Sequence, residues 1–114
     1  PWQVCLAHDR SGQVCGYVVW RHEHGFVQVG DFLARDPHTL TQPLFLAFAR
    51  LARRPTGQSI PVEFFGSARV AAQLRDAGMV ARPGQAPLFA GAATPAAFLS
   101  PEAWYLTSFD NDAD

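Results

Sequence analysis

Asp31 is the residue whose type and position most directly suggest chemistry. It lies in FVQVGDFLA, a run of strand-forming residues from Phe26 to Ala34. Strict alternation along a strand would place Asp31 on one face with three aliphatic side chains, those of Val27, Val29 and Leu33. A carboxylate in such company is costly unless it is hydrogen-bonded or reactive. Two interpretations follow: a general base whose pKa is raised by burial, or a structural carboxylate bonded to loop N–H groups or an arginine.

The segment after this strand, RDPHTLTQP from Arg35 to Pro43, is expected to be a loop that leads into a helix. Thr41 is the expected N-cap, and Pro43 then falls in the first turn, where a missing N–H costs least. N–H groups at a helix start point toward negative charge, so a strand–loop–helix unit can hold a phosphate. The helix is indicated by apolar residues at helical spacing: Leu44, Phe45, Phe48, Leu51 and Ala52.

The other expected elements place antiparallel strands first and helices later. They are strands over Trp2–Asp9, Val14–His22, Phe26–Ala34, Ser59–Phe65, Val80–Ala92 and Trp104–Asp110, and a helix over Ser67–Met79. Ser67 is the expected cap of that helix, and Gly78 suits its left-handed end. The order β-β-β-α-β-α-β-β indicates an α+β fold, an antiparallel meander followed by a β-α-β crossover. We expect one domain over residues 1–114, with a mixed sheet whose third and fourth strands are parallel and adjacent.

This order and several of its segments resemble the GNAT acyltransferase superfamily. Val29–Ala52 corresponds to the family's acyl-CoA site, LRDAGM is similar to its Y-x-x-x-G-F segment, and WYLTSFDNDAD is similar to the ending of a subset of GNAT-like proteins. The resemblance runs from the family's second strand to its last, so the family's first strand and first two helices are absent from this chain. It implies acyl-CoA-dependent N-acyltransferase activity, with acetyl-CoA or another acyl-CoA as co-substrate and a small-molecule amine as acceptor.

The resemblance also assigns roles to residues of this chain. The strand edge at Phe32, Leu33 and Ala34 would pair with the pantetheine amides. The following loop would receive the pyrophosphate through side-chain donors: Arg35, His38, Thr39 and Thr41. Asp31 would be the catalytic base, and transfer would proceed directly from the bound thioester by positioning the two substrates together. On this hypothesis Arg35→Ala weakens acyl-CoA binding.

The chain departs from the family pattern at two places. The family loop reads Q/R-x-x-G-x-G/A, whereas TLTQP (Thr39–Pro43) holds no glycine, and Pro43 lacks an N–H donor. The family's frequent general-acid tyrosine corresponds to Leu74, which cannot donate a proton. Both departures favour a second hypothesis, a catalytically degenerate GNAT-like domain with a structural, dimerisation or regulatory role. A third is an unrelated α/β domain with the same order of elements.

Other polar residues have plainer interpretations. His22 and His24 lie at an expected turn, and together with His8 and His38 they lack a complete ligand set, so no metal site is predicted. Tyr105 could replace the missing proton donor, but a surface or interface position fits it better, whereas its neighbours Trp104 and Leu106 are expected in the core. The alternating carboxylates of the acidic end are interpreted as a frayed terminus: Asp110, Asp112 and Asp114. Cys5 and Cys15 are interpreted as buried thiols, and a disulfide between them is not inferable.

Composition limits the classes of partner. The chain has 114 residues, 48% of them hydrophobic, and a net charge of −1, which suits one globular domain and gives no bulk attraction to nucleic acid or anionic membrane. No apolar run approaches the ~18 residues of a membrane helix, and no signal peptide is recognised. All nine basic residues are arginine, which excludes a lysine-based mechanism within this chain. We expect a cytoplasmic protein whose partner is a second copy or an upstream domain of the same protein.

Overall fold

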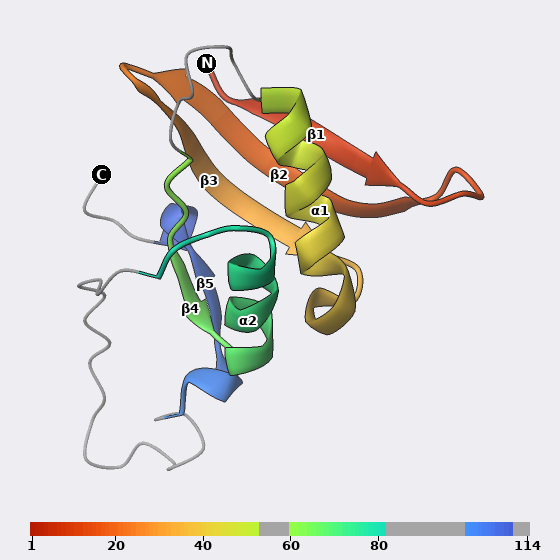
Figure 1. Ribbon diagram of the computed structural model, residues 1–114, viewed down its shortest axis with the longest axis vertical. Helices are drawn as coiled ribbons and strands as arrows, with labels where there is room; N and C mark the ends of the chain where they lie inside the picture. Colours follow the sequence, from red (N-terminus) through yellow and green to blue (C-terminus); the bar gives the residue numbers. More distant parts are fainter. Residues whose placement is uncertain (53–59, 82–99, 111–114) are drawn as a thin grey trace.

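The chain folds into an α+β arrangement in which antiparallel sheets are combined with helices. The structure, a computed structural model, describes residues 1–52, 60–81 and 100–110. Figure 1 shows a three-stranded sheet crossed by one helix, with a smaller strand pair and a second helix beside it. The elements are β1 (Gln3–His8), β2 (Val14–Glu23), β3 (Phe26–Ala34), α1 (Pro37–Ala52), β4 (Phe64–Gly66), α2 (Ala68–Asp76) and β5 (Tyr105–Thr107), with short 3-10 helices η2 (Pro101–Ala103) and η3 (Ser108–Asp110). The α+β class is confirmed, whereas the strand expected over Val80–Ala92 falls almost entirely outside the described residues.

Two tight turns connect β1, β2 and β3 into an antiparallel meander in that order. In the first turn, Oδ1 of Asp9 accepts hydrogen bonds from the backbone N–H groups of Ser11 and Gln13, at 2.9 and 3.0 Å. Gly12 has a φ of +85° and Gly25, in the second turn, a φ of +79°, conformations that glycine adopts without steric cost. The predicted meander is confirmed because its turn chemistry is local to the sequence.

A β-bulge at Gly30 interrupts the alternation of side chains along β3. Val29 pairs with Trp20 and Asp31 with Val19, so the register shifts and Gly30 is the extra residue. Val27 and Val29 before the bulge are buried on the same face of the sheet as Phe32 and Ala34 after it. The expectation that Asp31 shares a face with Val27 and Val29 is therefore wrong, because one inserted residue reverses the alternation.

Helix α1 begins at Pro37, four residues before the expected cap at Thr41. Pro37 occupies the first helical position, and the Asp36 carbonyl accepts the N–H of Leu40 at 2.8 Å. The expected loop over Arg35–Pro43 and the expected cap at Thr41 are both wrong. Thr41 is fully buried in the second turn, where its hydroxyl donates to the Pro37 carbonyl at 2.7 Å. Pro43 is tolerated inside the helix because it lies on the exposed side, while its neighbours Leu44 and Phe45 are buried.

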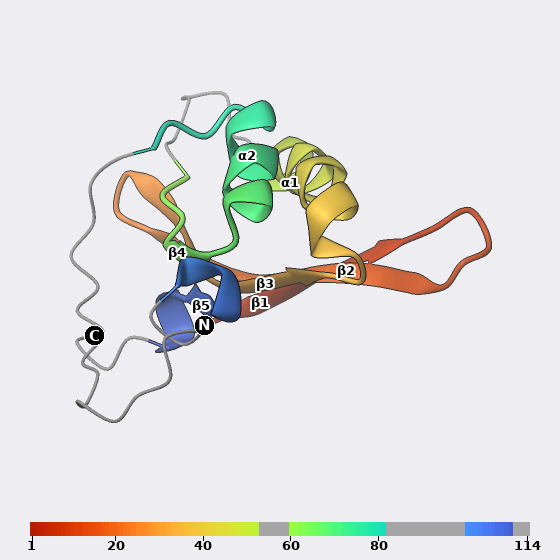
Figure 2. The ribbon, with the colours of Figure 1, turned by 90° about the horizontal axis from the view of Figure 1, so that it is seen from below.

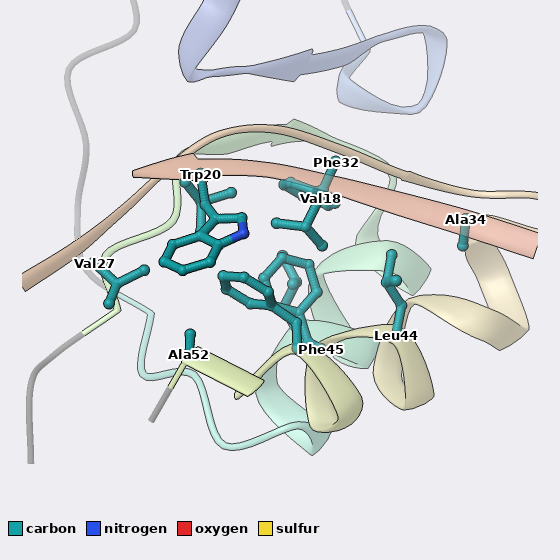
Figure 3. Packing of buried hydrophobic residues seen from close by; sticks show 11 residues of the cluster. Val18, Trp20, Val27, Phe32, Ala34, Leu44, Phe45 and Ala52 are labelled. Atoms are coloured by element: carbon teal, nitrogen blue, oxygen red, sulfur yellow. The ribbon is translucent and has the colours of Figure 1, made fainter. Parts of the chain in front are cut away.

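The core lies between the three-stranded sheet and the inner face of α1 (Figure 3). Phe32, Phe45 and Phe48 have no exposed surface. Phe45 meets Phe32 edge-to-face with ring centroids 4.9 Å apart, and Phe48 meets Trp20 at 5.5 Å. Four of the five residues predicted to form the apolar face of α1 are buried, but Leu51 is 64% exposed.

Helix α2 has the cap residues that the sequence indicates, although it ends at Asp76 and not at Met79. Ser67 Oγ accepts the N–H groups of Arg69 and Val70, at 3.1 and 3.5 Å. At the other end, Gly78 has a φ of +102°, and its N–H and that of Met79 donate back into the last turn in a Schellman arrangement. Neither helix of the described chain is long and apolar enough to span a membrane.

The last strand pairs with β4 and not with the three-stranded sheet. Phe65 lies opposite Leu106 in an antiparallel ladder, and within the described residues no ladder joins β3 to β4. All the ladders of the described chain are antiparallel, so the expected parallel pairing of the third and fourth strands is not formed there. Trp104, expected in the core, is 36% exposed. Figure 2 shows β5 and η3 on the side of the three-stranded sheet opposite to α1 and α2.

Removing the ring of Phe48 should cost far more stability than removing the side chain of Leu51 from the same helix. Phe48→Ala leaves a cavity in the core, and we expect the free energy of unfolding to fall by about 3–5 kcal/mol. Leu51→Ala should change it by less than about 0.5 kcal/mol. Urea unfolding of both variants measures the difference, and equal losses would contradict the assignment of the buried face.

Candidate functional site

Asp31 lies in a hydrogen-bonded cluster that joins β2, β3 and β5. Its Oδ2 accepts the hydroxyl of Tyr17 at 2.9 Å, and its Oδ1 accepts the hydroxyl of Thr107 at 2.8 Å. The backbone N–H of Thr107 donates to Oδ2 of Asp110 at 2.8 Å, which fixes the end of β5. Each oxygen of the Asp31 carboxylate thus has a partner within the protein, as a structural carboxylate should have. Its partners are hydroxyl groups and not the loop N–H groups or arginine that the sequence suggested.

The bulge at Gly30 positions this cluster. It turns the Asp31 side chain away from the face of the sheet that α1 covers, and the carboxylate meets Thr107 of β5. β5 lies on the side of the sheet opposite to α1 (Figure 2). Gly30 also admits Phe109 of η3, because a Cβ at this position would overlap the Phe109 ring. Phe109 in turn meets the ring of Trp2 edge-to-face, with centroids 4.8 Å apart. The glycine therefore permits both the turn of Asp31 and the close packing of the C-terminal 3-10 helix.

The two tyrosines of this region are held in their protonated form. Burial, and then the hydrogen bond to Asp31, raise the pKa of Tyr17 above its usual value of 10.0. Burial raises the pKa of Tyr105 further, and the negative charge of Asp31 adds to that effect. A protonated hydroxyl can donate a hydrogen bond, and both do so, Tyr17 to Asp31 and Tyr105 to the carbonyl of Phe32 at 2.7 Å. Tyr105 is thus a tether between β5 and β3.

Four backbone donors at the β3–α1 junction have partners within the protein. The N–H of Arg35 donates to the Cys15 carbonyl at 2.8 Å, and those of Thr39 and Leu40 donate to the Asp36 carbonyl. The N–H of Gln42 donates to the side-chain carbonyl of Gln73 in α2, at 2.8 Å. A phosphate site needs N–H groups that converge outward. These four donors are instead used to close the start of α1 and to join it to α2.

The side chains expected to receive the pyrophosphate point to different partners. Arg35 reaches Oδ2 of Asp9 at 3.4 Å, and the pKa of Asp9 is lowered chiefly by its hydrogen bond from Ser11. Nε2 of His38 lies 3.2 Å from Oγ of Ser67, at the start of α2. Thr41 is buried and bonded to the helix backbone, as described above. Thr39 is exposed on the first turn of α1.

The edge of β3 expected to pair with pantetheine is partly used by Tyr105. Phe32 is buried in the core and its carbonyl accepts the tyrosine hydroxyl. Leu33 is 39% exposed on the outer face, and Ala34 is buried beneath α1. Of the eight residues that the resemblance singles out, Asp31 thus faces the outer side of the sheet, and His38 and Thr39 lie at the start of α1.

Sequence reasoning missed Tyr17 and the role of Gly30. A glycine inside an otherwise regular strand pattern is a recognised signal for a bulge, so Gly30 could have been identified. Nothing local distinguishes Tyr17, since its partner is fourteen residues away across the hairpin. Among the described residues, no three or more His, Cys, Asp or Glu side chains gather as a metal site would require. Cys5 and Cys15 are both free thiols.

Comparison of the chain with protein-family models, with curated proteins and with solved structures found no match.

Removal of the Thr107 hydroxyl should weaken the attachment of β5 to the sheet. Thr107→Val keeps the shape of a buried side chain but leaves Oδ1 of Asp31 without its donor. We expect the free energy of unfolding to fall by about 1–3 kcal/mol. Thr39→Val, which removes an exposed hydroxyl, is the matched control and should have little effect. Equal effects in denaturant titrations would show that the hydroxyl bond to Asp31 is not structural.

The chain has only two tyrosines, so their ionisation can be followed directly. Both pKa values are raised in the folded state, so the fold favours the protonated forms. That contribution to stability is present below pH 10 and is lost as pH rises through the folded-state values. We expect the ultraviolet difference spectrum of the folded protein to show ionisation only above pH 10, and in denaturant near pH 10. A native midpoint at 10 for either residue would contradict the cluster.

Proposed function

We propose that this chain is a catalytically degenerate GNAT-like domain with an interaction role, and not an acyl-CoA-dependent N-acyltransferase. The observation that carries the proposal is the closed β3–α1 junction. The N–H groups of Arg35, Leu40 and Gln42 are bonded to acceptors in β2, before α1 and in α2. A pyrophosphate would have to displace these bonds, each of which contributes about 0.5–1.5 kcal/mol to stability.

The position of Asp31 supports the same proposal. The best candidate for a base is bonded through both carboxylate oxygens, to Tyr17 and Thr107. It also faces away from α1, the helix whose start the resemblance assigns to the cofactor. An acyltransferase needs its base and its thioester within reach of one acceptor nitrogen. The two halves of the site implied by the resemblance lie on different sides of the sheet.

Two further features agree with the loss of catalysis. Leu74, at the position where the resemblance implies a proton-donating tyrosine, is 7% exposed and packs in the core. The carbonyl of Phe32, on the strand edge that would pair with pantetheine, already accepts the hydroxyl of Tyr105. Leu74 is explained by its packing in the core, and the Phe32 carbonyl by its hydrogen bond from Tyr105, so neither needs a role in a reaction.

Thermal denaturation with and without saturating acetyl-CoA tests this proposal, with free CoA measured in parallel. We expect no change in Tm with either compound. A ligand present at a hundredfold excess over its Kd would add about 2.7 kcal/mol, a shift of several degrees for a domain of this size.

A shift of that size with acetyl-CoA would contradict the proposal. If Arg35→Ala then removed the shift while leaving the Tm of the free protein unchanged, the junction would be a cofactor site and the acyltransferase reading would replace ours.

A further inference from the structure

The outer edge of β1 is one of the strand edges of the described fold that form no ladder on their free side. In the described chain β1 forms a ladder with β2 alone, and Figure 1 shows it at the border of the three-stranded sheet. The N–H and C=O groups on the free side of an edge strand offer a template for another strand. An occupant of this edge must therefore be an extended backbone, which excludes a helix and a small anion.

The sequence of β1 lacks the features that usually keep sheet edges apart. Gln3–His8 contains no lysine, arginine, aspartate, glutamate or proline, and its register is irregular only at its end, between Ala7 and His8. The absence of charged side chains from β1 bears on which strand can pair with this edge. Because β1 contains no such charged side chain, an antiparallel pair of two β1 strands brings no like charges together in any register.

The two faces of β1 differ in burial. Cys5 and Ala7 point toward α1 and pack against the core. Val4 and Leu6, on the outer face beside Val19 and Tyr17, are 61% and 53% exposed. Exposed aliphatic side chains on an uncharged edge are typical of a surface that becomes covered. β5 and η3 lie on the outer side of the sheet beside β3 (Figure 2). Val4 and Leu6 stay exposed.

We propose that β1 pairs antiparallel with β1 of a second copy of this chain, with Cys5 of the two copies opposite each other. In this register Val4 of each copy faces Leu6 of the other, and Gln3 faces Ala7. The four exposed aliphatic side chains then form one apolar cluster, and two three-stranded sheets become one continuous sheet. A register centred on Leu6 would instead place Val4 opposite the imidazole of His8, which is a poorer match. The inference rests on the interaction role proposed above and names its partner.

Sedimentation equilibrium of the whole chain, from about 5 to about 500 µM, tests the association, because a strand pair with a small apolar cluster should dissociate in the micromolar range. We expect a monomer–dimer equilibrium. Leu6→Lys and, separately, Val4→Lys place a charge in the cluster and should weaken dimerisation at least about tenfold. Val80→Lys is the control, because it adds the same charge at an 82% exposed position beyond α2, away from β1. Circular dichroism checks that each variant is folded.

Disulfide cross-linking through Cys5 tests the register of the β1–β1 pair. In a Cys15→Ser variant, copper–phenanthroline with dissolved oxygen should join the two Cys5 thiols as a disulfide, the oxidant taking two electrons and two protons being released. A Cys5→Ser variant, which retains Cys15, should form no such product. A dimer that the oxidant does not cross-link through Cys5 would overturn the Cys5-centred register.

A chain that remains monomeric over the whole concentration range would overturn self-pairing, as would a dimer that both lysine variants leave unchanged. These outcomes are separate from those of the melting experiment. If the chain is a monomer and its Tm does not change with acetyl-CoA, self-pairing is wrong and the interaction role stands with a different partner. A dimer whose Tm rises with acetyl-CoA would leave self-pairing in place and remove the non-catalytic role.

Discussion

One extra residue in β3, at Gly30, determines how the rest of the domain is assembled. Before it, Val27 and Val29 face α1; after it, Phe32 and Ala34 do. Regular alternation would have sent either the first pair or the second to the outer face, at a cost of about 1.5–3 kcal/mol for each large apolar side chain exposed. The bulge keeps both pairs in the core and releases Asp31 to the other side. It also leaves room for the Phe109 ring, which would have to shift if position 30 carried a Cβ.

The position of Asp31 makes the C-terminal segment part of the fold. The strand β5 forms its ladder with β4, and β4 forms none with the three-stranded sheet in the described chain. The strand pair is joined to β3 by side chains: Thr107 donates to Asp31, and Tyr105 donates to the backbone of Phe32. These bonds explain why a carboxylate and two hydroxyl groups are retained at a sheet face without assigning them a reaction. Asp31, the candidate base, thus attaches β5 to the three-stranded sheet.

The sequence predicted what is local and missed what depends on distant partners. The meander and the caps of α2 follow from glycines, Asp9 and Ser67, whose hydrogen bonds span a few residues. The start of α1 was misplaced because Asp36–Pro37 and Thr41–Pro43 are competing start signals, and burial of Thr41 decides between them. The face of Asp31 was misjudged because strict alternation ignored the glycine beside it. Its partners Tyr17 and Thr107 come from other strands, and no periodicity shows them.

Four backbone donors at the start of α1 are already used within the protein. The most direct test follows the backbone amide signals of Arg35, Thr39, Leu40 and Gln42 by nuclear magnetic resonance while acetyl-CoA is added. We expect their positions to remain unchanged and their hydrogens to exchange slowly with solvent, as internally bonded amides do. Shifts of these four signals that grow and saturate with acetyl-CoA would contradict the account and identify the junction as a phosphate site.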